Sequence, residues 1–271
     1  MMQIPRIKIL TLFTLISLLS FTSCKKQIGK EYETDFARFF NNYKGAFVLY
    51  DVKNNYYLKH NEQRCKERFS PCSTFKIPNT LIGLETAVIT DESFSIKWDE
   101  TDYGREAWNK DQTLDSAMKN STVWFYREIA RRIGQERMQE YVNKINYGNK
   151  DISGGIDKFW LSSSIKISPE EQVEFLNKLY KGSLPFSERS VNILKNLIVQ
   201  DSTEYYVFSG KTGSGNTENN GNKTGLGWFV GAVKLANGNL FIFAVNIEGD
   251  NADGITAREI AKNILKSMKL M

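Results

Sequence analysis

A serine and a lysine three residues apart offer the chemistry of nucleophilic catalysis. Ser73 and Lys76 lie in the stretch 71–78, where a helix would put both side chains on one face of its first turn. A serine hydroxyl is a weak nucleophile, and a free lysine is protonated at neutral pH and cannot accept a proton. The pair therefore needs an environment that neutralises or modifies Lys76. Ser73 could also simply cap a helix, so the rest of the chain must distinguish the two interpretations.

More short motifs follow this pair along the chain, each common on its own. They are Ser121-Thr122-Val123, Tyr147-Gly148-Asn149, Trp160-Leu161, Lys211-Thr212-Gly213, Trp228-Phe229-Val230-Gly231 and Arg258. Their order is informative. Ser-x-x-Lys on a helix, a serine in a helical region and Lys-Thr-Gly on a late strand form the three-part signature of penicillin-recognising serine enzymes.

Strand patterns occur near both ends of the chain, and helical patterns lie between them. Residues 46–52 and 56–60 form a predicted hairpin, and residues 205–210, 226–235 and 239–246 are predicted strands. The middle, 77–198, is mostly helical in pattern. We predict an α+β fold with an antiparallel sheet built from both chain ends and an inserted helical lobe. A cleft is expected where the lobe meets the sheet.

Several boundaries can be predicted from local chemistry. Helices at 31–42 and 253–268 should flank the sheet, because apolar residues recur there at helical spacing. Thr113 and Ser168 precede helix starts with N-cap chemistry. Residues 214–227 are polar and glycine-containing, so we expect a mobile loop there. We also expect the run 127–132 to be an exposed helix face.

The first 24 residues are predicted to be a signal peptide. Arg6 and Lys8 precede an apolar run at 9–21, which is too short to span a bilayer comfortably. The segment ending at Cys24 resembles a bacterial lipoprotein signal, with Cys24 as a lipid anchor. Phe21 departs from the usual aliphatic residue, so ordinary secretory cleavage is the alternative. Either process predicts an exported domain at 25–271, periplasmic or membrane-anchored on the periplasmic side.

Composition limits the kinds of partner and site. The chain has 271 residues and a net charge of +5, of which Arg6 and Lys8 contribute two, so nucleic acid is not an expected partner. The chain has a single histidine, His60, so we expect neither a Ser-His-Asp triad nor a metal site. Cys65 and Cys72 can form a disulfide or stay buried as free thiols. Oligomeric state is left open.

The motifs together resemble a class D (oxacillinase-type) serine β-lactamase. Ser121-x-Val123 stands where class A enzymes have Ser-Asp-Asn, and Pro-x-Ser-Thr-Phe-Lys-Ile-Pro-Asn surrounds Ser73. The resemblance runs from Ser73 to Arg258 and implies hydrolysis of the β-lactam amide bond through a Ser73 acyl-enzyme, which confers resistance to these antibiotics. The substrate spectrum is not predicted, since it depends on the shape of the loops near Trp108 and at 214–227.

The resemblance also implies roles for individual residues. Ser121 would relay a proton to the leaving nitrogen, and Lys211 would supply positive charge that supports this relay. Thr212 and Arg258 would bind the substrate carboxylate. The oxyanion would be held by the backbone amides of Ser73 and Ser214. Tyr147-Gly148-Asn149 is interpreted as a structural loop that borders the site.

In this class the lysine of Ser-x-x-Lys is carbamylated by carbon dioxide. Lys76 would thus become N6-carboxylysine, an anionic general base, with bicarbonate as the only added requirement. Trp160 would donate its indole N–H to the carbamate, and Val123 and Leu161 would shield it. No metal or organic cofactor is implied.

Two other functions share these motifs. Penicillin-sensing receptors resemble class D enzymes but acylate without rapid turnover, and they carry several membrane spans. Peptidoglycan peptidases and transpeptidases typically have Ser-x-Asn at the second motif, so Val123 counts against them.

Overall fold

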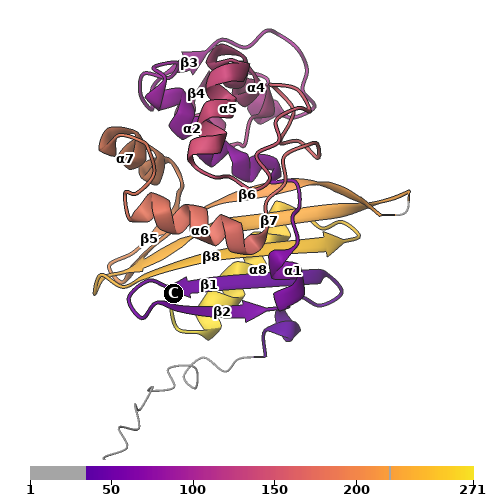
Figure 1. Ribbon diagram of the computed structural model, residues 1–271, viewed down its shortest axis with the longest axis vertical. Coiled ribbons are helices and arrows are strands. Elements are labelled where there is room, and N and C mark those ends of the chain that lie inside the picture. Colours follow the sequence, from indigo (N-terminus) through magenta and orange to yellow (C-terminus); the bar gives the residue numbers. More distant parts are fainter. Residues whose placement is uncertain (1–34, 220) are drawn as a thin grey trace, which may run out of the picture. The chain divides into compact units, whose positions relative to one another are not determined.

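The computed structural model describes residues 35–219 and 221–271, and six of their strands form one antiparallel sheet (Figure 1). These strands are β1 (Lys44–Asp51), β2 (Tyr56–His60), β5 (Val199–Ser202), β6 (Tyr206–Asn219), β7 (Asn222–Leu235) and β8 (Leu240–Gly249). Their order across the sheet is β2-β1-β8-β7-β6-β5. The early hairpin thus pairs with the late strands through β1 and β8, and the predicted sheet from both chain ends is confirmed.

Helices cover both faces of this sheet. Helix α6 (Pro169–Tyr180) packs against β1 and β8, while α8 (Gly254–Ser267) packs against β6, β7 and β8 from the opposite side (Figure 1). Nearly every residue of β1 and β8 is buried, as expected for strands covered on both faces. The short helix η2 (Phe36–Phe39) contacts α8. The N-terminal helix predicted at 31–42 begins outside the described residues, and from residue 35 to residue 42 only the 3₁₀ turn of η2 is helical, so the predicted extension to residue 42 is wrong.

The inserted helical lobe lies between the strands in sequence and beside the sheet, on the side of β6 (Figure 1). It contains α2 (Lys76–Glu85), α3 (Leu114–Lys119), α4 (Val123–Ile133), α5 (Gln135–Lys144) and α7 (Glu188–Leu197), with η4 (Glu106–Trp108) and the small pair β3 (Ser95–Ile96) and β4 (Gln112–Thr113). The region 77–198, predicted to be mostly helical, supplies this lobe, but one of its helices lies elsewhere. Helix α6 packs on the sheet, because its buried face meets the apolar strands.

Capping side chains fix the starts of several helices, among them α3, α6 and α8. Thr113 accepts from the N–H of Ser116 at the start of α3, and Ser168 accepts from the N–H of Glu171 at the start of α6. Both form capping boxes, since the side chain at the third position reaches back to the N-cap amide. Asp253 caps α8. The predicted N-caps at 113 and 168 are confirmed.

The expected mobile loop at 214–227 is instead a β-hairpin. Strand β6 does not end at Gly210 but continues to Asn219, and its ladder with β7 runs from Tyr206↔Leu235 to Asn219↔Asn222. The hydrogen bonds between β6 and β7 keep this segment ordered, although its polar side chains gave no indication of a strand. The sequence from Lys211 to Gly215 therefore lies on a strand, where its position relative to the helical lobe is fixed.

Two contacts hold the sheet against the segment that precedes the lobe. Arg64 of α1 (Glu62–Lys66) is buried and pairs with Glu248 at 2.9 Å and with Asn246 of β8. Gly213 of β6 approaches Pro71 and Thr74 so closely that a Cβ would lie 2.9 Å from the Pro71 carbonyl oxygen. Only glycine fits there without displacing backbone.

The two described cysteines are free thiols, so the free-thiol alternative holds. Cys65 Sγ lies 3.2 Å from the His60 carbonyl oxygen, whereas Cys72 Sγ lies 3.6 Å from that of Ser70, so each faces a different backbone carbonyl. Burial raises the pKa of Cys65 to about 12 and also raises that of Cys72. Both thiols therefore favour the unreactive protonated form.

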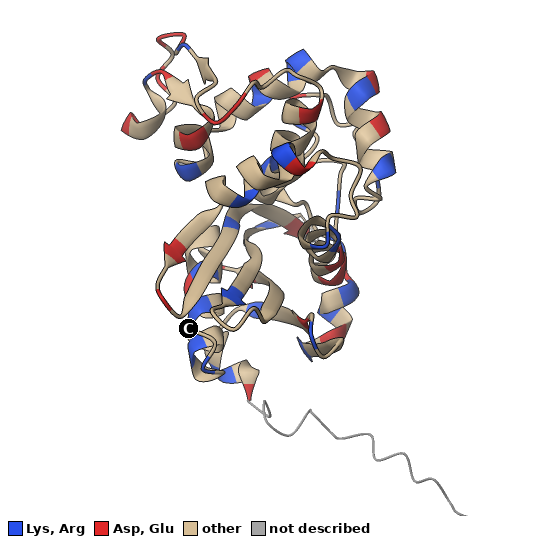
Figure 2. Cartoon of the chain, turned by 90° about the vertical axis from the view of Figure 1, so that its left-hand side faces the viewer, with Lys and Arg blue, Asp and Glu red and all other residues tan. Residues whose placement is uncertain are grey.

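Charged side chains of both signs are interspersed over the described helices (Figure 2). Within residues 35–219 and 221–271, none of the helices has the length and apolar character needed to cross a membrane. Cys24 and the predicted leader lie outside the described residues.

Candidate active site

Ser73 and Lys76 lie at the junction of two helices. Ser73 belongs to the 3₁₀ helix η3 (Cys72–Phe75), which continues directly into α2 at Lys76. Lys76 Nζ lies 2.7 Å from Ser73 Oγ, within hydrogen-bond distance. The predicted pairing of these side chains on one turn is therefore present.

Lys76 sits in an environment that disfavours its charge. Its side chain is fully buried, and burial lowers the pKa of Lys76 well below its ordinary value, assisted by the positive charges of Lys211 and Arg105. Burial of an amine without an acidic partner favours its neutral form. A neutral amine can accept a proton or react with an electrophile, so the obstacle noted for a free lysine is removed.

The backbone is strained at two points beside Ser73. Cys72 and Ser121 have φ angles of 50° and 54°, in the left-handed region that residues other than glycine rarely adopt. Such strain is maintained by the surrounding fold and is frequent at functional sites. The two backbone angles set the directions of the Ser73 and Ser121 side chains. Neither angle can be predicted from residue type.

Trp160 is buried close to this junction and has an unpartnered polar atom. Its ring stacks on Phe75 with centroids 5.7 Å apart, and its carbonyl accepts from Ser70 Oγ. The indole Nε1 has no hydrogen-bond partner among the described residues. A buried donor without an acceptor costs about 1–3 kcal/mol. The structure thus contains an indole N–H available to a further acceptor.

Lys211 and Ser121 form a second lysine–serine pair. Lys211 Nζ donates to Ser121 Oγ at 3.1 Å and to the carbonyl and hydroxyl oxygens of Thr212, each at 3.2 Å. Ser121 follows α3 and Lys211 lies on β6, so this contact joins the lobe to the sheet. Burial and the positive charge of Arg258 lower the pKa of Lys211 to about 7.

This low pKa predicts a pH-dependent stability. An unfolded lysine has a pKa of about 10.4, so between about pH 7 and about pH 10 the unfolded chain binds more protons than the folded chain. The free energy of unfolding should rise with pH there, by at most about 1.4 kcal/mol per pH unit from Lys211. We expect Lys211→Met to reduce this slope, measured by urea unfolding in carbon dioxide-free buffers between those limits. The exposed Lys266→Met should keep the slope. An unchanged slope in Lys211→Met would show that the pKa of Lys211 is not lowered in the folded protein.

An open cavity of about 350 Å³ lies in front of the two serines. Its lining residues are Ser73, Arg105, Trp108, Lys119, Asn120, Ser121, Val123, Thr212, Ser214, Asp253, Ile255 and Arg258. It thus brings together six of the ten predicted site residues. Lys76, Lys211 and Trp160 are buried and lie outside this lining, and Leu161 is half-buried against the core. The lining residues that were not predicted are Arg105, Lys119, Asn120, Asp253 and Ile255.

The middle of β6 is tied to the start of α8, the helix that carries Arg258. Ser214 Oγ accepts from the N–H of Gly254 at 2.9 Å. Arg258 is half-buried, and its Nε lies 3.3 Å from Glu259. These contacts hold Thr212, Ser214 and Arg258 on one wall of the cavity, as binding of one small anion requires.

The Tyr147-Gly148-Asn149 motif is hydrogen-bonded to residues 164–166, a few positions after Trp160. Asn149 exchanges hydrogen bonds with the backbone of Lys166 and donates to the carbonyl of Ser164. Tyr147 is buried edge-on against Phe75. These contacts support the predicted structural interpretation of the motif.

His60, the histidine considered for a Ser-His-Asp triad, lies against an aromatic ring. His60 stacks on Phe40 and has no hydrogen bond to Ser73 in the described chain. Over the same residues, no group of three or more His, Cys, Asp or Glu side chains could hold a metal ion.

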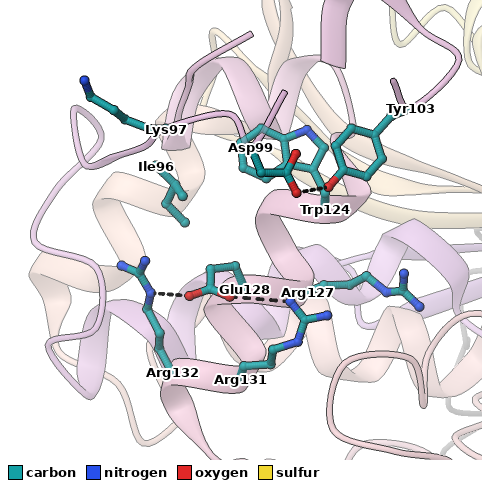
Figure 3. Close-up of a pocket in the computed structure, with 9 residues that line it drawn as sticks. All are labelled: Ile96, Lys97, Asp99, Tyr103, Trp124, Arg127, Glu128, Arg131 and Arg132. Carbon is teal, nitrogen blue, oxygen red and sulfur yellow. Dashed lines mark hydrogen bonds and ion pairs between the residues drawn. The ribbon is translucent and has the colours of Figure 1, made fainter. Parts of the chain in front are cut away.

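A second hollow, of about 220 Å³, lies beside α4 (Figure 3). Arg131 and Arg132 there are exposed, but Ile129 and Ala130 are fully buried, so the run 127–132 is only in part the exposed helix face that was predicted. The two exposed arginines are also paired. Arg131 contacts Asp157 at 2.5 Å, and Arg132 contacts Glu128 at 2.8 Å. These arginines are therefore largely neutralised within the protein.

Comparison with known proteins agrees with this geometry. Residues 45–266 match the family model of the penicillin binding protein transpeptidase domain. The chain is 42% identical over 227 residues to the probable β-lactamase YbxI of Bacillus subtilis, covering 84% of this chain and 82% of that one. The solved structure of the class D β-lactamase BAT-2 has a TM-score of 0.82 and 41% identity, with 89% and 98% of the two chains covered.

A regulatory protein is also similar. BlaR1 of Bacillus licheniformis is 39% identical, but the match covers 87% of this chain and only 39% of that protein. The C-terminal domain of this penicillin receptor has a TM-score of 0.83. The enzymes, by contrast, are matched over nearly their full length. The chain therefore belongs to the penicillin binding protein transpeptidase domain family and, within it, to the class D serine β-lactamases.

Proposed function

We propose that this chain hydrolyses the amide bond of β-lactam antibiotics through an acyl-enzyme on Ser73, with carbamylated Lys76 as general base, and so confers resistance. The observation that carries the proposal is the 2.7 Å contact between Ser73 Oγ and the fully buried Nζ of Lys76. No metal or organic cofactor takes part in this reaction.

The first half-reaction acylates Ser73. Its Oγ attacks the lactam carbonyl carbon as its proton passes to the base at Lys76. The backbone amides of Ser73 and Ser214 stabilise the oxyanion. When the C–N bond breaks, the leaving nitrogen takes the proton of Ser121, and Ser121 is reprotonated with the proton that left Ser73, which frees the base at Lys76. Ser121 accepts a hydrogen bond from Lys211.

The second half-reaction, hydrolysis of the acyl-enzyme, also needs a general base. Water attacks the ester carbonyl and gives a proton to the base at Lys76, and this proton passes to Ser73 Oγ as the C–O bond breaks, which restores the hydroxyl. When carbamylated, Lys76 supplies an anionic acceptor for that proton. Thr212 and Arg258 meanwhile bind the substrate carboxylate, Arg258 through its planar guanidinium.

The environment of Lys76 suits this modification. Carbon dioxide forms an N–C bond only with a neutral amine, which loses one proton, and the low pKa of Lys76 favours that neutral form. The unpartnered N–H of Trp160 is a donor for the carbamate oxygen. Val123, in the cavity lining, and Leu161, half-buried after Trp160, are the apolar residues proposed to shield it.

Steady-state turnover tests the function. Substoichiometric mature protein is incubated with a chromogenic cephalosporin and with oxacillin, with and without bicarbonate. We expect many turnovers per enzyme and a higher rate with bicarbonate.

A penicillin sensor is the second candidate, since BlaR1 is 39% identical. A sensor would release one equivalent of product in a burst and then stop. That result would contradict the lactamase assignment and favour the sensor.

We also propose that the chain is exported and that Cys24 is its lipid anchor. The charged start, the apolar run at 9–21 and the lysines at 25–26 support this. Cys24→Ser should move the protein from the membrane fraction to the soluble exported fraction. Retention of the variant in the membrane would contradict the anchor.

A further inference from the structure

Cations dominate the charged lining of the active-site cavity. Arg105 precedes η4, Lys119 ends α3 and Arg258 lies on α8, and all three line the cavity. The acidic residue in that lining is Asp253, whose carboxylate already accepts from the N–H of Thr256 as the cap of α8. The cavity thus carries more positive charge than the single substrate carboxylate bound by Thr212 and Arg258 requires.

Arg105 and Lys119 have no ion pair within residues 35–219 and 221–271. The guanidinium of Arg105 lies 4.8 Å from the ring centroid of Trp108. Trp108 is itself fixed, because its indole N–H donates to the carbonyl of Asn120 at 3.0 Å. Stacking therefore holds an unpaired cation over one wall of the cavity.

The hollow beside α4 provides a contrast within the same lobe (Figure 3). Its arginines contact Glu128 and Asp157, and Asp99 is engaged by Tyr103. An entering anion would have to displace these internal acids. At Arg105 no such competitor exists among the described residues, so an anionic group on a substrate can meet the guanidinium directly.

We propose that Arg105, assisted by Lys119, forms a second anion subsite that selects β-lactams whose side chain carries a carboxylate. This inference rests on the proposed function. Trp108 and Ile255, the latter 61% exposed, add apolar surface to the same cavity for an aryl group on that side chain. Arg105 is a specificity-determining residue in this account, distinct from the pair Thr212 and Arg258.

Three penicillins that differ in one substituent test the subsite. Benzylpenicillin has hydrogen beside its side-chain amide, carbenicillin a carboxylate and ampicillin an ammonium group. The measured quantity is the ratio of kcat/KM for carbenicillin to kcat/KM for ampicillin. We expect Arg105→Gln to lower this ratio about tenfold, because one charge is attracted and the other repelled across a partly solvated gap. Arg105→Lys should retain most of the ratio.

Controls separate this effect from a general loss of positive charge. Lys97→Gln removes a cation from the same inter-helix segment, but Lys97 lines the other hollow (Figure 3). It should leave the ratio within about twofold of the parent, whereas Lys119→Gln should lower it in the same direction as Arg105→Gln. The parent ratio should also fall as salt is added.

Two results would overturn the subsite. One is an unchanged ratio in Arg105→Gln, and the other is an equal fall in Lys97→Gln. Benzylpenicillin separates this failure from failure of the proposed function. Absence of its turnover by the parent would reject the lactamase assignment, whereas turnover with a ratio insensitive to Arg105 would reject the subsite alone.

Discussion

Ser73→Ala is expected to abolish β-lactam turnover, with kcat lower by about 10⁵- to 10⁶-fold, because no other group can form the acyl-enzyme. Intact-mass measurement of the variant after exposure to oxacillin should show no covalent adduct. The exposed Ser183→Ala should retain full activity and form the adduct. A covalent adduct on Ser73→Ala would assign the nucleophile elsewhere.

Lys76→Ala should give a different result from Ser73→Ala. Loss of a general base slows proton transfer by about 10²- to 10⁴-fold, so acylation becomes slow but Ser73 remains present. Water attack then lacks its base as well, and the acyl-enzyme should accumulate as a stable mass adduct. Steady multiple turnover by Lys76→Ala would contradict the role of Lys76 in deacylation.

The second large effect is expected at Trp160. Trp160→Phe keeps a stacked aromatic ring against Phe75 but removes the unpartnered N–H. A hydrogen bond to a charged group contributes about 1.5–3 kcal/mol, so the carbamate should require about 10- to 100-fold more bicarbonate to form. Activity should be low in carbon dioxide-free buffer and recover as bicarbonate is added.

Trp228→Phe is the matched control for this experiment. Trp228 is also a fully buried indole, but its N–H already donates to the carbonyl of Ser70 at 2.9 Å. Loss of this hydrogen bond in Trp228→Phe should lower the stability of the fold without changing the bicarbonate dependence of activity. Equal bicarbonate dependence in Trp160→Phe and the parent would show that the indole N–H does not stabilise the carbamate.

Local chemistry made the helix starts and the inner strands predictable. Ser168 followed by Pro169 specifies a cap and a first turn, and the apolar runs of β1 and β8 specify buried strands. The extension of β6 beyond Gly210 was not predictable in this way, since its polar and glycine-rich end is held by the ladder with β7. The position of α6 likewise depends on the sheet it packs against.

The site was predictable where motif order identified residues and unpredictable where tertiary contacts create chemistry. Ser73, Ser121 and Lys211 follow a recognised order, and the fold brings them to one cavity or directly behind it. Arg105 and Lys119 belong to none of the recognised motifs, and only the folded structure shows that they line this cavity. The strain at Cys72 and the unpartnered N–H of Trp160 also exist only in the folded chain.

Carbamylation of Lys76 can be observed by ¹³C NMR of the enzyme with labelled bicarbonate. The parent enzyme should show one carbamate carbonyl resonance, absent in Lys76→Ala, whose intensity rises with bicarbonate in step with turnover. A fully active parent enzyme that lacks this resonance would contradict the account.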